Sequence, residues 1–184
     1  MKRSKKLTLA VMGLTPIVLT ACSEKPVDML VYKTLNECSS DVYYNSRQCK
    51  TEFDKALRTH RSGAPMYRNA ASCEGDFGKS RCENLGRFYS PRIAAYMIPM
   101  PRKQGQPYYG GIAQPLYTTR GGGGSYRTGD NYEIGKSSQR GKISTSASKA
   151  RAPSVKTKTI ARGGFGSQAA VRGSWGGGGK SFGG

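Results

Sequence analysis

The sequence predicts a small, mainly α-helical, disulfide-stapled module followed by a largely disordered tail rich in Gly, Arg and Lys. Four cysteines lie close together between residues 38 and 82, with a helical pattern of apolar residues among them. Residues 87–184 carry 16 of the 30 basic residues and 20 of the 25 glycines, but only two of the 11 acidic residues. A stretch of that composition buries too little apolar surface to offset the entropy of its chain. The predicted segments are residues 1–21, 22–86, 87–101 and 102–184.

Whole-chain composition already limits the class of protein. The chain has 184 residues, a formal net charge of +19 and only 36% hydrophobic residues. This length suits one domain, and the composition indicates that the domain does not fill the chain. A large enzyme fold, a multi-span membrane protein and a strict repeat solenoid are all poor fits.

The first 21 residues have the features of an export signal. Four basic residues among the first six precede an apolar run at residues 7–19. That run is shorter than the roughly 20 residues that span a bilayer, so we expect it to be removed. It leads into Leu19-Thr20-Ala21-Cys22, which is similar to the lipobox of bacterial lipoproteins, where the cysteine thiol accepts a diacylglyceryl group. An ordinary secretory signal that contains a cysteine is the alternative.

Acylation of Cys22 predicts where the protein is found. Two or three acyl chains give a lasting membrane anchor, whereas one chain binds only marginally. Ser23 follows the cysteine, and by resemblance to enterobacterial lipoproteins the lack of Asp there favours the outer membrane. We therefore expect a lipid-anchored protein of the cell envelope that faces the periplasm, with membrane lipid as its first partner.

The other four cysteines are Cys38, Cys49, Cys73 and Cys82. An even number in an exported chain is typical of disulfides, and four cysteines allow three pairings. A repeat favours one of them: Tyr32 precedes Cys38 by six positions, Tyr67 precedes Cys73 by the same six, and each unit closes with a second cysteine. We therefore favour Cys38–Cys49 and Cys73–Cys82 over the crossed pairings, in one small helical element used twice.

Local signals predict three short helices within residues 22–86. Thr34 begins the pattern of a capping box. The strongest helix covers residues 47–61 after the cap Ser46, because its apolar side chains recur on one face. Asn69 is the expected cap of a third helix that ends at a glycine. The one strand signal lies at residues 29–32.

Signals for catalysis or metal binding are weak. His60 is the single histidine and lies on the face of the predicted helix, where packing is the simpler role. The acidic residues are scattered among Lys and Arg, and no complete phosphate loop of the form Gly-x4-Gly-Lys-Ser/Thr occurs. Structural zinc is the rival interpretation of the four cysteines, but no Cys-x2-Cys pair occurs and the expected compartment is oxidising. We expect no enzymatic activity, no cofactor and no metal.

Residues 88–101 form an apolar stretch that contains three prolines. The prolines limit any helix there to about two turns. Two interpretations remain open. The stretch packs onto the cysteine module as additional core, which we favour, or it docks onto a membrane surface or a partner protein.

Arginine and glycine recur together in the last part of the chain. In a cytosolic protein this pattern predicts an RNA-binding tail, with guanidinium groups on phosphates and aromatic rings stacked on bases. The predicted anchor removes that interpretation, so we expect no nucleic acid. A flexible polycation also binds anionic lipids or cell-wall polymers, and a solvated tail that binds nothing is the alternative. The residues expected to contact an anionic surface are Arg120, Arg127, Lys156, Lys158, Arg162 and Arg172.

This ordered set of features resembles one family of bacterial lipoproteins, called DUF1190 or UPF0441. The resemblance runs from the lipobox through the two Tyr/Cys/Cys units to residues 114–117 (Gln-Pro-Leu-Tyr) and 162–166 (Arg-Gly-Gly-Phe-Gly). It implies a protein of the envelope and supplies no mechanism, because the family has no established activity. The middle of this chain is shorter and more basic than we expect of the family.

These predictions favour a binding or scaffolding lipoprotein that holds anionic envelope material through its cationic tail. The alternative is an accessory subunit that docks onto a neighbouring envelope enzyme or export complex, with the cysteine module and residues 88–101 as its docking surface.

Overall fold

The computed structural model describes Glu24 and residues 26–101, 110–120 and 124–153. The helices are α1 (Leu35–Ser39), α2 (Ser46–Gly63) and α3 (Ala70–Phe77). The strands are β1 (Pro26–Tyr32), β2 (Cys82–Asn84), β3 (Tyr89–Pro91), β4 (Ala95–Pro99), β5 (Gln114–Thr118), β6 (Ser125–Arg127), β7 (Glu133–Lys136) and β8 (Gly141–Ser146). The predicted signal peptide lies outside the described residues, as do Cys22, Lys156, Lys158, Arg162 and Arg172.

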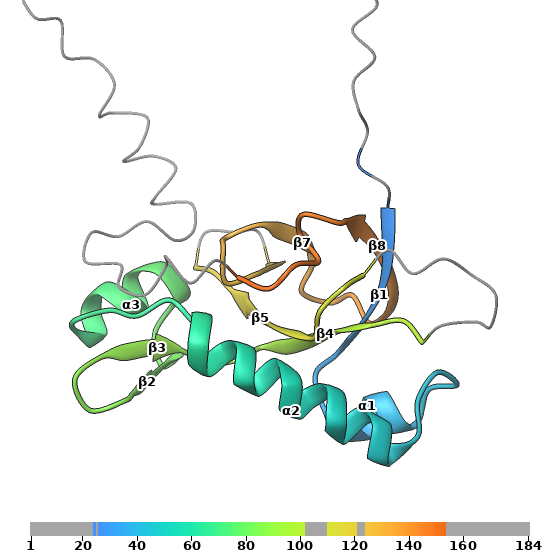
Figure 1. The fold of residues 1–184 in the computed structure, drawn as a ribbon. Helices are drawn as coiled ribbons and strands as arrows, with labels where there is room; N and C mark the ends of the chain where they lie inside the picture. Colours follow the sequence, from blue (N-terminus) through green and yellow to red (C-terminus); the bar gives the residue numbers. More distant parts are fainter. Residues whose placement is uncertain (1–23, 25, 102–109, 121–123, 154–184) are drawn as a thin grey trace, which may run out of the picture.

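Six strands form one antiparallel sheet in the order β7-β6-β5-β4-β1-β8 (Figure 1). In β1, Met29 pairs with Pro99 of β4 on one side and with Ile143 of β8 on the other. The sheet curls so that its two edges approach each other, and the Lys149 ammonium, just after β8, donates to the Glu133 carbonyl in β7 at 3.1 Å. The result is a nearly closed barrel built from both ends of the described chain.

The interior of this curled sheet holds the largest apolar core. Its residues come from five strands and from the loop after β8: Val27, Met29, Val31, Ala95, Met97, Leu116, Tyr126, Ile143 and Ala150. A side chain added at Gly111 would collide with the sulfur of Met29, so this glycine is required by close packing against β1. Each large side chain buried here contributes about 1.5–3 kcal/mol.

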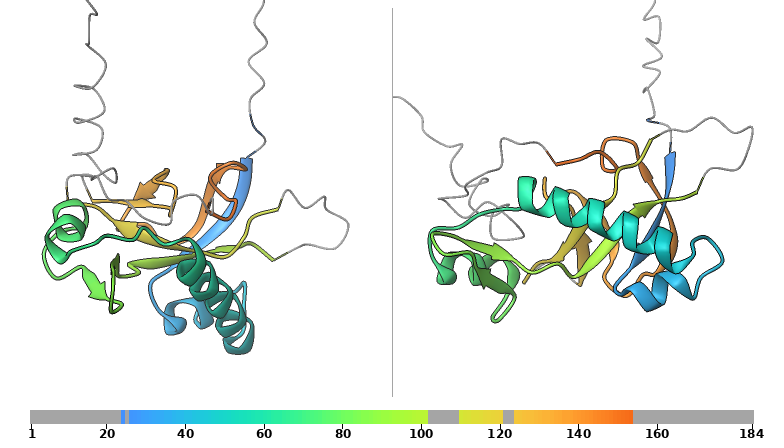
Figure 2. Two further views of the ribbon diagram at one scale, coloured as in Figure 1. Left: turned by 60° about the vertical axis from the view of Figure 1, so that its left-hand side comes forward. Right: turned by 60° about the horizontal axis from the view of Figure 1, so that its bottom comes forward.

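Helices α1 and α2 cover the outer face of the sheet beside β1 and β4 (Figure 2). Leu30 and Tyr32 point to this face and pack with Phe53 and Ala56 of α2. The ring of Phe53 stacks on Tyr96 of β4, with centroids 4.1 Å apart. Both faces of β1 are therefore buried, one in the barrel and the other under the helices.

Helix α3 and the β2–β3 hairpin form a smaller lobe (Figure 1). Phe77 of α3 makes edge-to-face contacts with Tyr67 and Tyr117, with ring centroids 6.0 and 5.9 Å apart. All three rings are completely or almost completely buried. Because Tyr117 belongs to β5, it attaches the smaller lobe to the barrel.

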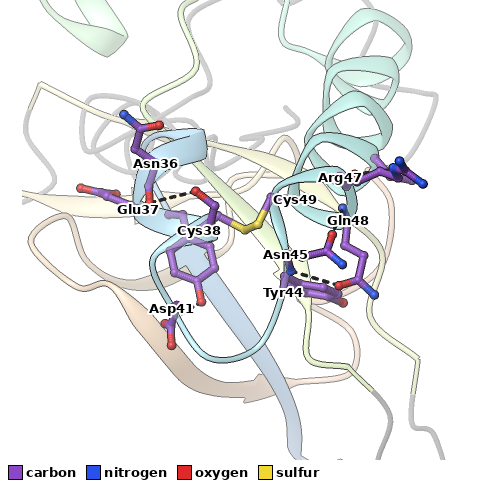
Figure 3. The surroundings of a disulfide bond; sticks show 12 residues. Asn36, Glu37, Cys38, Asp41, Tyr44, Asn45, Arg47, Gln48 and Cys49 are labelled. Atoms are coloured by element: carbon purple, nitrogen blue, oxygen red, sulfur yellow. Dashed lines mark hydrogen bonds between the residues drawn. A yellow bond between two sulfur atoms is a disulfide. The ribbon is translucent and has the colours of Figure 1, made fainter.

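Two disulfides join Cys38 to Cys49 and Cys73 to Cys82, which is the pairing that the sequence repeat favours. The first links α1 to α2 (Figure 3), and the second links α3 to β2. With these bonds formed, none of the four sulfurs is a thiolate that could bind zinc.

The fold class predicted from the sequence is wrong. The described chain is mainly β, and residues 22–86 are not a separate α-helical module because β1 pairs with β4 and β8. Residues 110–153 are not a disordered tail, since they supply four of the six strands of the main sheet. The strand signal at residues 29–32 is the second half of β1. In β8 only Ile143 and Thr145 are buried, so its composition resembles that of a loop.

The helix signals were more informative than the strand signals. Thr34 caps α1 and Asn69 caps α3, as predicted. Helix α2 is longer than predicted at both ends. Its cap is Asn45 instead of Ser46, and Asn45 forms a reciprocal capping box with Gln48 (Figure 3).

Candidate functional site

A pocket of ≈ 240 Å³ lies where the smaller lobe meets the barrel. Its walls come from the end of α3, the two open ends of the β2–β3 hairpin, the start of β4 and the end of β5. Three lining residues are apolar, and we call them the apolar floor: Phe77, Ile93 and Ala94. The other four are polar or charged: Ser80, Arg81, Arg92 and Thr118.

The two arginines of the pocket are neighbours across the hairpin. The hairpin pairs Cys82 with Pro91, and the next step of the same register places Arg81 opposite Arg92. The Arg92 amide donates to the Arg81 carbonyl at 2.7 Å. Residues opposite each other in an antiparallel pair project from the same face, and both of these line the pocket.

Arg81 is held in place from three sides. The Cys73–Cys82 disulfide ties the following residue to α3. The Arg81 guanidinium donates to the hydroxyl of Thr118 at the end of β5. The preceding residue, Ser80, has a φ of 61°, a left-handed conformation that side chains other than glycine rarely adopt. The backbone of Arg81 is thus constrained on both sides, and its exposed side chain has a hydrogen-bond partner in Thr118.

The two arginines of the pocket have no acidic partner in an ion pair. Among the described residues none of the ion pairs includes Arg81 or Arg92. One carboxylate does reach the pocket wall, where Glu74 of α3 accepts a hydrogen bond from the Ser80 amide at 2.9 Å. Like charges directly opposite on neighbouring strands repel each other. Neither arginine is among the predicted site residues, since their pairing depends on a hairpin whose strands are three residues long.

Two of the six residues predicted to contact an anionic surface are described. Arg120 is exposed, and its amide donates to the Asp76 carbonyl at 2.8 Å, beside the end of α3 and near the pocket. Arg127 lies in β6, where its guanidinium donates to the Glu133 carboxylate at 3.0 Å. The structure brings Arg120 toward the pocket, but it pairs Arg127 within the β6–β7 hairpin.

His60 belongs to a buried polar cluster that joins α2, β2 and β5. Its Nδ1 lies 2.9 Å from the Tyr117 hydroxyl, and its Nε2 lies 3.3 Å from the Glu83 carboxylate. A carboxylate only accepts, so Nε2–H donates to Glu83 and the Tyr117 hydroxyl donates to Nδ1. Burial lowers the pKa of His60, and Glu83 opposes this shift. Burial also raises the pKa of Tyr117, so both groups are neutral at pH 7.

This order of carboxylate, imidazole and hydroxyl is that of a proton relay. A relay needs a substrate at its hydroxyl end, but Tyr117 is completely buried and His60 is only 8% exposed. The cluster therefore fastens three elements together, and the hydroxyl that would face a substrate in such a relay is buried.

The sequence repeat includes an aspartate that the sequence analysis missed. The Tyr32 hydroxyl donates to Asp41 at 2.7 Å, and the Tyr67 hydroxyl donates to Asp76 at 2.9 Å. Each aspartate follows the first cysteine of its unit by three positions, as Cys38 and Asp41 show (Figure 3). The full unit is Tyr-x5-Cys-x2-Asp, and an alignment of the two copies would have found it.

A second pocket of ≈ 350 Å³ has Pro99, Met100 and Pro101 of the apolar stretch in its lining. Met97 and Ile98 of the apolar stretch at residues 88–101 are completely buried in β4, so they offer no docking surface. Within the described ranges, no group of three or more His, Cys, Asp or Glu side chains could hold a metal ion. None of the helices described is both long and apolar enough to cross a membrane.

The curled sheet, the two disulfide units and the basic pocket all lie within one stretch of the chain that matches a known family. The family model described as "Protein of unknown function (DUF1190)" matches residues 26–176. The chain belongs to this family, which confirms the resemblance found in the sequence.

Similar proteins cover nearly the whole chain. A UPF0441 protein of Yersinia pestis bv. Antiqua is 26% identical over 200 residues, covering 94% of this chain and 85% of the relative. A UPF0441 protein of Photorhabdus laumondii subsp. laumondii is 27% identical over 186 residues, covering 83% of this chain and 77% of the relative. No solved structure matches this chain significantly. These names state no activity, so a function has to be argued from the chain itself.

Proposed function

We propose that the protein is a lipid-anchored binding protein of the cell envelope. In this proposal acylated Cys22 holds it at the outer membrane, facing the periplasm, and its basic residues bind anionic lipid headgroups or cell-wall polymers. The observation that carries the proposal is the start of the folded domain. β1 begins only four positions after Cys22, at the end of the barrel where Lys149 and Arg151 lie.

The short link to Cys22 supports a position against the membrane. Four extended residues span at most about 14 Å. A lipid on Cys22 would therefore keep Pro26, the first residue of β1, close to the bilayer surface. Because β1 lies inside the main sheet, the whole barrel would be held there.

The end of the barrel nearest to Cys22 carries two basic residues beside Glu24. Pro26 pairs with Ser146 at the end of β8, and the Ser148 hydroxyl donates to the Glu24 carboxylate at 2.7 Å. The loop after β8 therefore lies beside the start of the domain, and this loop carries Lys149 and Arg151. Each basic residue close to an anionic leaflet contributes about 1 kcal/mol to binding.

The end of the chain adds basic residues to the same proposal. Residues 154–184 contain Lys156, Lys158, Arg162 and Arg172 and no acidic residue. Several weak electrostatic contacts on one chain add to the affinity of the anchor, because the anchor keeps them at high local concentration. Salt is expected to weaken them.

Labelling with radioactive palmitate tests the anchor. The native chain should incorporate the label and remain in the membrane fraction, whereas Cys22→Ser should lose both properties. Ser23→Ala is the matched control and should keep both, because the acylated thiol is unchanged. Label retained by Cys22→Ser would contradict the anchor.

Vesicle sedimentation tests the basic residues. The mature chain with Cys22→Ser should bind phosphatidylglycerol vesicles at low salt, and replacing Lys156, Lys158, Arg162 and Arg172 with Gln should weaken binding at least tenfold. The matched control replaces four exposed basic residues of the domain, Lys33, Arg47, Arg58 and Lys136, with Gln. Equal losses in the two variants would show that only total charge matters and would contradict a binding role of the tail.

A further inference from the structure

We infer that the pocket at the junction of the smaller lobe and the barrel binds a small anion that carries an apolar group. The ligand class is a phosphate or carboxylate joined to a short aliphatic or aromatic substituent. This inference rests on the pocket alone and does not depend on the lipid anchor or the basic tail.

The anionic part follows from the two arginines. Arg81 and Arg92 lie opposite each other, line the same pocket and have no carboxylate partner among the described residues. Two like charges in that position repel each other, and a bound anion would relieve the repulsion. A guanidinium group matches the geometry of a phosphate or carboxylate through two parallel hydrogen bonds. One anion between them can therefore satisfy both arginines.

The hydroxyl groups of the pocket fit the same ligand. The Thr118 hydroxyl accepts a hydrogen from Arg81, which leaves its own proton to donate. Ser80 also lines the pocket and carries a second hydroxyl. The disulfide at Cys82 and the hydrogen bond to Thr118 restrict Arg81, which lowers the entropy that this side chain loses when a ligand binds.

The apolar part of the ligand follows from the floor of the pocket. Phe77, Ile93 and Ala94 form a surface that inorganic phosphate alone would leave in contact with water. An apolar substituent on the anion would cover this surface and gain about 25 cal/mol per Å². A volume of ≈ 240 Å³ is below the roughly 300–1,000 Å³ of pockets that take drug-sized ligands. We therefore expect a short substituent.

Binding of three probes to the mature chain with Cys22→Ser tests the inference by calorimetry at low salt. Phenyl phosphate should bind saturably and more tightly than inorganic phosphate, which lacks the apolar group, or benzyl alcohol, which lacks the charge. Arg81→Gln and Arg92→Gln should each weaken phenyl phosphate binding about tenfold or more. The matched control is Arg87→Gln in the exposed β2–β3 turn, which should bind like the native chain.

Several outcomes would overturn the inference. Equal binding of inorganic and phenyl phosphate would exclude a role of the apolar floor, and equal binding of benzyl alcohol would exclude an anion site. An equal loss in Arg87→Gln would mean that general charge attracts the probe. Arg92→Lys guards against misfolding, since it keeps the charge and should retain more affinity than Arg92→Gln.

Two sources of this ligand chemistry can be separated by competition. Vesicles of phosphatidate should displace phenyl phosphate if the natural ligand is a lipid headgroup, and should leave it bound if the ligand is a soluble anion. Failure of the pocket experiments would leave the palmitate and tail experiments untouched, because they use different residues.

Discussion

The Tyr67 hydroxyl donates to the carboxylate of Asp76, nine residues later, at 2.9 Å within the buried core of the smaller lobe. Tyr32 makes the same hydrogen bond to Asp41 across the same nine residues, at 2.7 Å. Tyr32 pairs with Tyr96 of β4, and Tyr67 forms an isolated bridge with Tyr89 of β3, each just before a capped helix. The repeat is therefore a complete structural unit, in which a Tyr–Asp bond spans a short helix and a disulfide joins that helix to α2 in the first copy and to β2 in the second.

The two Tyr–Asp bonds should differ in their contribution to stability. Asp76 is only 5% exposed, so Tyr67→Phe removes a donor from a buried carboxylate and should cost about 1–3 kcal/mol. Asp41 is only half-buried and water can replace the lost donor, so Tyr32→Phe should cost less than about 1 kcal/mol. Urea unfolding of the two variants measures both values. Equal losses would contradict the difference in burial.

The features that were predicted correctly from the sequence are those that depend on residues close together along the chain. The favoured disulfide pairing joins cysteines 11 and 9 positions apart, and the caps at Thr34 and Asn69 act within three residues. Such signals depend on local geometry, so one sequence contains them. The same locality led to the error in fold class, because these helices were the strongest signals in a chain that is mainly sheet.

The sheet could not be predicted because its pairings are distant and its strands are short. β1 pairs with β8, more than a hundred residues further along the chain. β8 and β6 contain Ser, Thr, Lys and Arg, and in β8 the residues that alternate with buried Ile143 and Thr145 are exposed or half-buried. Gly111 is one of the 20 glycines on which the prediction of disorder was based, although close packing against Met29 requires a glycine there. The amino-acid composition averaged over residues 87–184 gave no sign of strands that are only three to six residues long.

The candidate pocket could not be predicted for the same reason as the sheet, because it depends on pairing between separate segments. Arg81 and Arg92 are eleven positions apart and become neighbours only when β2 pairs with β3. His60, Glu83 and Tyr117 likewise meet across three elements. Among the residues predicted to contact an anionic surface, the prediction for Arg120 depends least on the fold, since this residue only has to be exposed.

A fragment covering residues 22–86 should not fold. It keeps both disulfides and β1 but lacks β4 and β8, against which Val27, Met29 and Val31 are buried. Exposing these side chains would cost about 1.5–3 kcal/mol each. The three helices left in the fragment, α1, α2 and α3, should not recover this cost, because isolated helices of these lengths are at best marginally stable in water. The fragment should give poorly dispersed amide resonances, whereas residues 22–153 should give a dispersed spectrum. A dispersed spectrum from the shorter fragment would show that residues 22–86 fold as a separate module.

Acid should destabilise the protein through His60. Burial lowers its folded pKa below the usual 6.5, so below about pH 6.5 the unfolded chain takes up a proton that the folded chain does not. The free energy of unfolding should then fall as the pH drops from about 6.5 towards the folded pKa. The variant His60→Gln should lack this slope, whatever its absolute stability. Urea unfolding between pH 7 and pH 5 measures the slope, and an equal slope in both chains would rule out His60 as its source.

Removing either disulfide should lower the stability of the protein, but removing only one of them should also weaken ligand binding. Each closes a loop of about ten residues, so Cys38→Ala/Cys49→Ala and Cys73→Ala/Cys82→Ala should each cost about 2–3 kcal/mol. Only the second pair adjoins Arg81, so only its loss should also weaken phenyl phosphate binding. Thermal unfolding and calorimetry of the two double variants measure these effects. An equal loss of binding in both would show that general destabilisation is responsible.

Removing one arginine of the pocket should have opposite effects with and without ligand. In the free protein, Arg92→Gln removes the repulsion from Arg81 and should raise the free energy of unfolding by about 0.2–1 kcal/mol. In saturating phenyl phosphate the native chain gains stability from the ligand and the variant gains much less, so the order should reverse. Arg87→Gln, on the exposed turn of the same hairpin, should change stability by less than about 0.5 kcal/mol and respond to the ligand like the native chain. A purely structural role for Arg92 would lower stability in both conditions, because no anion would then distinguish them.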